Sequence, residues 1–185
     1  MGKLDDIYSI SPYRNFVNRT YFDEKKVGSP IYGEITQFGA NNLINYFREH
    51  FNNGAIFYDL GCGIGKLVAH VGTMGIKKSI GIEYSKERYK GCCHIKNTYC
   101  SELKNIEFYN KSYFEHDFSD ATIIYIDNTC CSKETNKILY DKVPKGCLFL
   151  FKSKYKLYPK EEILFEKDLV ERTYKQNSIY WLIKE

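Results

Sequence analysis

Short apolar runs recur along the chain and predict the strands of a buried parallel sheet. Three of these runs are strongly apolar or β-branched: Ala55–Leu60, Ala121–Ile126 and Cys147–Phe151. Two further strands are predicted at Ser79–Glu83 and Ile106–Tyr109.

Helical patterns separate the predicted strands. In Glu34–Phe51 apolar residues recur at helical spacing until Gly54 ends the pattern. Three more helices are predicted at Lys66–Met74, Ser85–Leu103 and Lys133–Val143. This alternation of strands and helices is typical of a parallel sheet with right-handed crossovers.

The end of the chain breaks the alternation. Ile163–Val170 and Ser178–Ile183 are two strand candidates with no helix between them, which indicates an antiparallel C-terminal hairpin. The predicted fold class is therefore α/β: a Rossmann-like, mostly parallel seven-stranded sheet with helices on both faces. Residues 1–30 are turn-rich and polar, so we interpret them as a partly helical N-terminal arm on a domain of residues 31–185.

Composition agrees with one globular domain. The chain has 185 residues, of which 43% are hydrophobic, and roughly 150 residues make one domain. The net charge of +4 does not by itself indicate a nucleic-acid-binding protein. No apolar run approaches the roughly 18–20 residues of a membrane helix, and Met1–Ile10 lacks the composition of a signal peptide. One late lysine cluster is interpreted as solvated surface rather than a binding patch: Lys152, Lys154, Lys156 and Lys160.

Seven cysteines at irregular spacing argue against a disulfide framework and for a reducing compartment. We therefore expect an intracellular protein, cytoplasmic or nuclear. Cys92-Cys93-His94 is a cluster of potential ligands, but consecutive helical residues point about 100° apart and no second pair stands at zinc spacing. No metal site is predicted.

One glycine-rich motif carries the chemistry. Asp59-Leu60-Gly61-Cys62-Gly63-Ile64-Gly65 has the form DxGxGxG, directly between a predicted strand and a predicted helix. Glycines let the backbone approach a ligand closely, and open α/β sheets bind ligands at this edge. A dinucleotide fold prefers GxGxxG, whereas here the third glycine comes one position early and Lys66 follows it.

An acidic residue stands at the second strand end. Glu83 lies about 20 residues beyond the glycine motif, where such a residue accepts both ribose hydroxyls of a nucleotide cofactor. Together, DxGxGxG and Glu83 form the pattern of class I S-adenosylmethionine-dependent methyltransferases. Two alternatives are a tight turn beside a surface charge, and NAD binding.

Further short motifs resemble the catalytic domain of the DOT-type (disruptor of telomeric silencing) histone lysine methyltransferases. They stand in the same order as in that family, over roughly residues 30 to 185: Tyr32-Gly33-Glu34, the glycine motif, Ile126-Asp127-Asn128, Pro144-Lys145-Gly146-Cys147 and Phe151-Lys152-Ser153-Lys154. The resemblance implies S-adenosyl-L-methionine as cofactor and a lysine-bearing protein, a histone or another, as substrate. It leaves direct nucleic-acid binding and the oligomeric state open.

The resemblance also implies roles for individual residues. The segment with Tyr32 and Glu34 would lie against the methionine part of the cofactor, above the glycine loop that begins at Asp59. Glu83 would hold the ribose. Asn128 would sit beside the methyl group and the incoming amine.

Other positions depart from the family pattern. Ser112-Tyr113 matches an Asp-Phe pair that reads adenine, so Tyr113 keeps the ring but Ser112 lacks the carboxylate. Lys66 replaces a glutamine and would either pair with the carboxylate of the cofactor or be solvated. Tyr180 resembles a tyrosine near the lysine channel, or else packs on a neighbour from an edge strand.

The reaction implied is methyl transfer to an amine. The sulfonium is already activated, so the protein must align the reactants, exclude water and present a neutral amine. Asp127 precedes Asn128 on the strand and is expected to point to the opposite face. Our leading hypothesis is a protein-lysine N-methyltransferase. The alternatives are a class I methyltransferase acting on RNA or a small molecule, and an inactive cofactor-binding module that regulates a partner.

Overall fold

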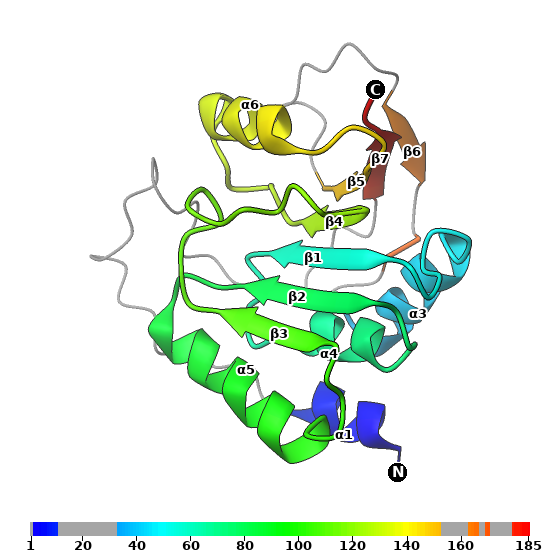
Figure 1. The fold of residues 1–185 in the computed structure, drawn as a ribbon, viewed down its shortest axis with the longest axis vertical. Helices are drawn as coiled ribbons and strands as arrows, with labels where there is room; N and C mark the ends of the chain where they lie inside the picture. The colour runs from blue at the N-terminus through cyan, green and yellow to red at the C-terminus, as the bar shows by residue number, and fades with distance from the viewer. Residues whose placement is uncertain (1, 11–32, 153–162, 167–168, 171–178) are drawn as a thin grey trace.

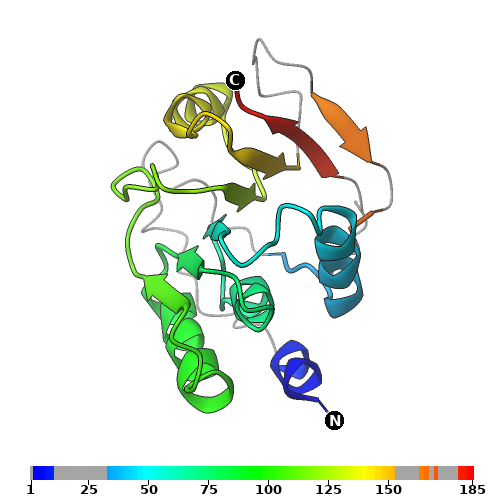
Figure 2. The ribbon, with the colours of Figure 1, turned by 45° about the vertical axis from the view of Figure 1, so that its right-hand side comes forward.

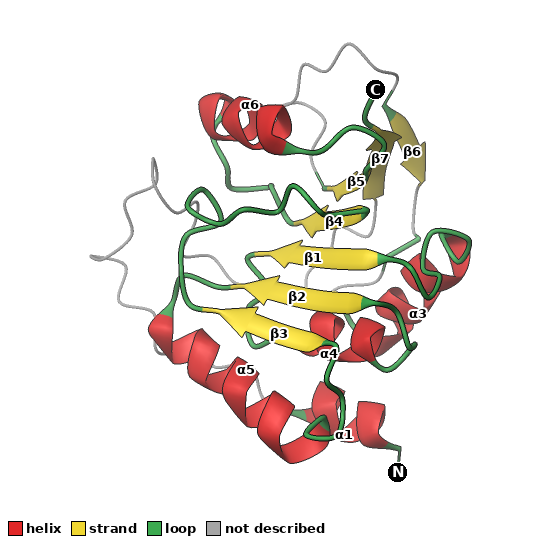
Figure 3. Cartoon of the chain, viewed as in Figure 1, coloured by secondary structure: helices red, strands yellow, loops and turns green. Residues whose placement is uncertain are grey.

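The computed structural model describes residues 2–10, 33–152, 163–166, 169–170 and 179–185. The predicted strand–helix alternation is confirmed in this part of the chain (Figures 1 and 3). The helices are α1 (Lys3–Ser9), α3 (Gln37–Tyr46), α4 (Lys66–Gly72), α5 (Lys86–Tyr99) and α6 (Lys133–Lys142). The strands are β1 (Ile56–Leu60), β2 (Lys78–Ile82), β3 (Ile106–Tyr109), β4 (Ile123–Ile126), β5 (Leu148–Phe151), β6 (Leu164–Glu166) and β7 (Ile179–Ile183).

The seven strands form one sheet in the order β3-β2-β1-β4-β5-β7-β6. Strands β1 to β5 run parallel, and β7 is antiparallel to both β5 and β6. The predicted α/β fold with an antiparallel C-terminal pair is therefore confirmed. The strand order reverses between β1 and β4, and open α/β sheets bind their ligands at such a switch point.

Helices cover both faces of the sheet (Figures 1 and 2). Side chains alternate along β1, so Phe57 packs in one core with α1, α3, α4 and α5, while Ile56 and Tyr58 pack in the other core with α6. Of the helices in the described ranges, none combines the length and the apolar character that crossing a bilayer requires.

Some predicted boundaries are wrong by a few residues for local reasons. Helix α3 begins at Gln37 rather than at Glu34, because Thr36 is its N-cap and accepts a hydrogen bond from the N–H of Gly39 at 3.1 Å. Helix α5 is capped by Ser85 as predicted but ends at Tyr99. The segment before α3 is therefore not helical. It places Glu34 at the edge of the sheet where β1 ends.

Candidate active site

The glycine loop connects β1 to α4 at the switch point of the sheet. Gly61, Gly63 and Gly65 all have positive φ, at 89°, 61° and 84°. A Cβ on Gly65 would lie 2.5 Å from the ring of Phe108, which packs against the loop from β3. The loop therefore needs glycine at Gly65 both for its backbone conformation and for close packing.

Replacing Gly65 by alanine should lower the free energy of unfolding by about 2–4 kcal/mol, because a left-handed residue costs about 1–2 kcal/mol and the clash adds to it. Gly75→Ala is the matched control, since Gly75 has φ 77° but no neighbouring atom within 4 Å of the added Cβ. It should cost only the conformational part, about 1–2 kcal/mol. Urea unfolding measures both, and equal losses would refute the packing argument.

Glu83 holds this loop against β2. Its carboxylate accepts one hydrogen bond from the N–H of Gly63 at 2.9 Å and another from the N–H of Ser85 at 2.7 Å. Burial raises the pKa of the Glu83 carboxyl, although Arg88 and the two N–H donors act in the opposite direction. A carboxylate has about four lone-pair sites, so the ribose contact predicted for Glu83 remains compatible with these bonds.

Two thiols pack together at this loop, the buried Cys92 of α5 and the half-buried Cys62 of the loop itself. Cys62 Sγ and Cys92 Sγ lie 3.9 Å apart, and Cys92 Sγ donates to the carbonyl of Gly63 at 3.1 Å. Burial raises the pKa of both thiols, which keeps them protonated. Cys62 and Cys92 thus act here as small packing residues.

The segment after β3 lies beside Glu83. Asn110 was not predicted as a site residue, yet its side-chain amide donates to the carbonyls of Glu83 and Tyr84, each at 2.9 Å. Its position one residue beyond β3 is the only sequence signal that could have suggested it. Ser112 is buried and accepts from the N–H of Phe114 at 3.2 Å. Tyr113 packs into the core on the α6 side, 3.9 Å from Cys131 Sγ, so its contact with adenine remains a prediction.

A pocket opens between the glycine loop, the segment before α3 and the end of β4. Its charged lining comprises three carboxylates and one ammonium group. Backbone and apolar groups complete it, and the lining residues are Gly33, Glu34, Ile35, Asp59, Gly61, Cys62, Lys66, Leu67, Tyr125 and Asp127. The structure thus brings together four of the predicted site residues: Glu34, Asp59, Gly61 and Lys66.

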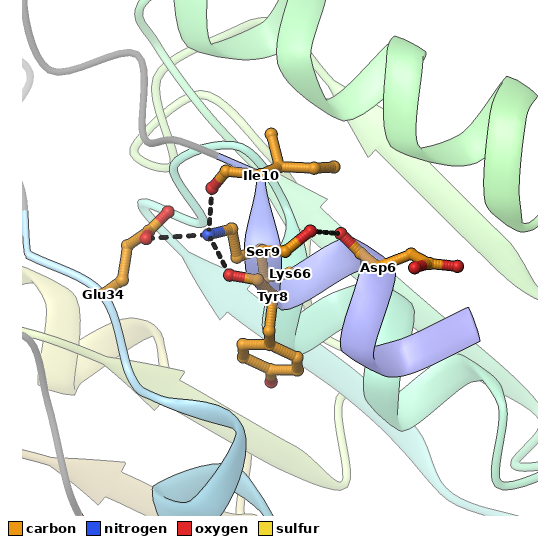
Figure 4. A network of polar contacts seen from close by, with 6 residues as sticks. All are labelled: Asp6, Tyr8, Ser9, Ile10, Glu34 and Lys66. Carbon is orange, nitrogen blue, oxygen red and sulfur yellow. Dashed lines mark hydrogen bonds and ion pairs between the residues drawn. The ribbon is translucent and has the colours of Figure 1, made fainter. Parts of the chain in front are cut away.

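Lys66 is buried rather than solvated, so one of the two expectations for it is wrong. Its Nζ atom lies 3.0 Å from Glu34 Oε2, and only 6% of the Lys66 side chain is exposed. It also donates to the carbonyls of Ile10 and Tyr8 at the end of α1 (Figure 4). The ammonium group is thereby fixed at the first residue of α4, on the wall of the pocket.

The neighbouring His70 makes stability depend on pH. Burial lowers the pKa of His70 from 6.5 to about 4, while Tyr8 Oη lies 3.2 Å from its Nδ1. Between these two pH values the unfolded chain binds a proton that the folded chain does not, so stability falls as the pH falls. From pH 6.5 to 4 the wild type should lose roughly 1–3 kcal/mol more than His70→Gln, measured by urea unfolding. Equal losses would contradict this assignment.

Asp127, and not Asn128, lines the described pocket. Asp127 Oδ1 accepts from Thr129 Oγ1 at 2.6 Å and from the Thr129 N–H at 3.2 Å. Its Oδ2 lies 4.0 Å from the Nζ of Lys152, whose side chain is 2% exposed. The expectation that Lys152 belongs to a solvated lysine cluster is therefore wrong. Lys154, Lys156 and Lys160 lie outside the described residues.

Asn128 is fully buried and joins three elements. Its Oδ1 accepts from the N–H of Lys152 at 3.0 Å, just after β5, and its Nδ2 donates to Asn136 Oδ1 of α6 at 2.7 Å. Asn136 in turn donates to the carbonyl of Ser132 at 2.8 Å. These are the contacts of a residue that holds the end of β4 in place, and the catalytic role of Asn128 remains a prediction.

Tyr180 lies on β7 and stacks on Phe151 with ring centroids 6.1 Å apart and an interplanar angle of 18°. Because β7 lies between β5 and β6, the expectation that Tyr180 belongs to an edge strand is wrong. Phe151 ends β5 directly before Lys152, so Tyr180 lies near the Asp127 side of the site. Tyr32 lies outside the described residues.

Known proteins share this architecture. A structure of a putative methyltransferase from Escherichia coli matches with a TM-score of 0.61 and 15% identity over 81% of this chain and 88% of that one. An RNA methyltransferase from Salinibacter ruber, solved with S-adenosyl-L-homocysteine, matches with a TM-score of 0.56 and 20% identity over 79% and 90%. A putative RNA methyltransferase from Pyrococcus horikoshii matches with a TM-score of 0.61 and 12% identity over 96% and 94%. These likenesses show the fold.

The fold and the glycine loop beside an acidic strand end thus define a class I S-adenosylmethionine-dependent methyltransferase. A family model described as "Histone methylation protein DOT1" matches residues 9–148, which is most of the chain. The protein belongs to this family. A comparison with curated proteins finds no match.

The pocket fits the charges of the cofactor. The methionine part of S-adenosylmethionine carries one carboxylate, one ammonium and the sulfonium. One cation, Lys66, and three carboxylates, Glu34, Asp59 and Asp127, line the pocket in the described part of the chain. The N–H groups of Gly61 and Gly63 are already bonded, to the carbonyl of Ile82 at 2.8 Å and to the carboxylate of Glu83 at 2.9 Å, so these glycines serve the site by letting the backbone approach a ligand closely.

Proposed function

We propose that this methyltransferase acts on the amino group of a lysine side chain in a protein. The match to the DOT1 family over residues 9–148 is the observation that carries this proposal. The residues after β4 support it, because Asp127-Asn128-Thr129-Cys130 is not the Asn/Asp-Pro-Pro-Tyr motif of base amino-methyltransferases.

When bound, S-adenosylmethionine supplies an electrophilic methyl group. The residues around the pocket would hold its amino-acid half through Lys66 and the facing carboxylates, and Glu83 would hold the ribose. Lysine has a reference pKa of about 10.4, so the acceptor must lose a proton before its nitrogen can attack. Nearby positive charge and partial desolvation both favour the neutral amine. The acceptor would first lose its proton to water; its nitrogen lone pair would then form the new N–C bond while the bond between the methyl carbon and sulfur breaks, so that S-adenosylhomocysteine leaves as a neutral thioether and the positive charge passes to the methylated nitrogen.

Methyl transfer from radiolabelled cofactor to a whole-cell lysate tests the proposal. Protease should remove the labelled material and nuclease should not, and acid hydrolysis should release methyl-lysine. Label that nuclease removes would instead indicate an RNA methyltransferase. Binding of S-adenosylhomocysteine without any transfer would support an inactive regulatory module. Either outcome would overturn the lysine proposal.

A further inference from the structure

The short helix α1 contacts the cation of the pocket directly, although it lies more than fifty residues away in sequence. Lys66 Nζ donates to the carbonyl of Ile10 at 2.7 Å and to that of Tyr8 at 3.3 Å, and it pairs with Glu34 Oε2 at 3.0 Å. Figure 4 shows the ammonium group between these three oxygens. An ammonium has three donors, so the three contacts define where Nζ lies.

Helix α1 is itself firmly attached to the domain. Ile7 is fully buried in the core that α3 and α4 share. The hydroxyl of Tyr8 lies 3.2 Å from His70 Nδ1, one turn beyond Lys66 on α4. Asp5 Oδ1 accepts from Gln37 Nε2 at 3.0 Å, at the start of α3. Movement of α1 would therefore move the partners of the Lys66 ammonium.

The ion pair between Lys66 and Glu34 is buried, which strengthens the interaction between their charges. The side chains of Lys66 and Glu34 are 6% and 9% exposed, so water screens their charges little. All three N–H groups of Lys66 have a partner, and the contact to the Tyr8 carbonyl, at 3.3 Å, is the longest of the three and therefore the one that a ligand oxygen would most readily share or replace. Because Lys66 lines the pocket, that oxygen would come from a ligand in the pocket, and a carboxylate would form the strongest bond with the ammonium group.

We propose that α1 is part of the cofactor-binding unit. Its terminal carbonyls hold the Lys66 ammonium where it receives the α-carboxylate of the methionine half, and Glu34 balances the charge of Lys66. Helix α1 thus acts as a positioning element for the amino-acid half of the cofactor and not for its adenosine half. The inference rests on the cofactor class alone and holds for any acceptor.

Two ligands separate the halves of the cofactor. S-adenosylhomocysteine has the amino-acid group, whereas 5′-methylthioadenosine keeps the adenosine and the thioether but lacks it. In calorimetry, Lys66→Met should lower the affinity for S-adenosylhomocysteine about 10- to 100-fold, because a charge-assisted contact is lost. The affinity for methylthioadenosine should change less than about threefold. Lys86→Met is the matched control, since Lys86 is the exposed first residue of α5. It should leave both affinities unchanged.

Hydrogen–deuterium exchange of the wild-type protein tests α1 without any substitution. S-adenosylhomocysteine should slow exchange of the amides in residues 3–10 at least about threefold more than methylthioadenosine does. Ile7→Ala, which loosens α1, should lower the affinity for S-adenosylhomocysteine but not the affinity for methylthioadenosine. Equal weakening of both ligands by Lys66→Met, or equal protection of α1 by both, would overturn the proposal. Neither readout needs an acceptor, so failure here is distinct from failure of the lysine assignment.

Discussion

Replacing Asp127 by asparagine is expected to lower kcat/KM for the protein acceptor about 10- to 100-fold while leaving the affinity for S-adenosylhomocysteine within about threefold of wild type. The expectation follows from the pocket lining, which contains Asp127 at the carboxyl end of β4. A carboxylate there can accept a hydrogen bond from the amine of the acceptor, and a charge-assisted bond is worth about 1.5–3 kcal/mol.

Sinefungin provides a second measurement that needs no acceptor. In this cofactor analogue a carbon bearing a primary amine replaces the methylsulfonium, so the amine occupies the region where the acceptor nitrogen would approach. If Asp127 lies beside that region, Asp127→Asn should lower the affinity for sinefungin about 10-fold or more, as measured by calorimetry. S-adenosylhomocysteine lacks this additional amine, so a change in its affinity should reveal only general damage to the pocket.

Asp117→Asn is the matched control. Asp117 Oδ1 accepts from the N–H of Ser119 at 2.9 Å, the same local turn that Asp127 makes with Thr129, but Asp117 is not among the residues lining the pocket. Asp117→Asn should leave the affinities for sinefungin and S-adenosylhomocysteine at wild-type values. If Asp127→Asn also left sinefungin binding intact, Asp127 would not be placed next to the acceptor.

Asn128→Ala should lower the free energy of unfolding by about 2–6 kcal/mol. The substitution leaves the buried Lys152 N–H without its acceptor and Asn136 Oδ1 without its donor, and each unsatisfied group costs about 1–3 kcal/mol. Urea unfolding followed by far-ultraviolet circular dichroism measures the change. The turnover of any folded Asn128→Ala fraction then separates a structural role from a catalytic one.

Asn52 offers a control with similar chemistry at the surface. Its amide donates to the carbonyl of Glu49 at 3.1 Å and accepts from the N–H of Gly54 at 3.0 Å, but the residue is exposed. Water can replace both bonds, so Asn52→Ala should cost less than about 1 kcal/mol. A stable Asn128→Ala variant with turnover lowered 100-fold or more would instead favour the catalytic role predicted from the sequence.

The strands were predictable because a strand covered on both faces must be apolar over its whole length. This holds for β1 and β5, which are buried throughout and each differ from prediction by one residue at the start. The edge strand β3 has the predicted bounds although it is mostly half-buried and contains Glu107. The glycine loop was equally predictable, because its three positive-φ positions are all occupied by glycine. Local patterns with local causes thus account for most of the fold.

The site was harder to predict where distant segments decide the outcome. Alternation along a strand correctly separates Asp127 from Asn128, but it does not say which of the two faces the pocket, and α6 and β5 settle that by bonding Asn128. The surroundings of Lys66 depend on α1, and burial of Lys152 depends on its place behind Asp127. None of these contacts leaves a periodic signal in the sequence.

The bonds from Glu83 to Gly63 and Ser85 have a kinetic consequence. They fix the glycine loop through its own chain, so the loop already has its shape before any ligand arrives. Binding then loses little conformational entropy in this segment, and association need not wait for a loop to close. Differences in affinity among ligands that share the ribose should accordingly arise in their dissociation rates, with association rates that are nearly the same.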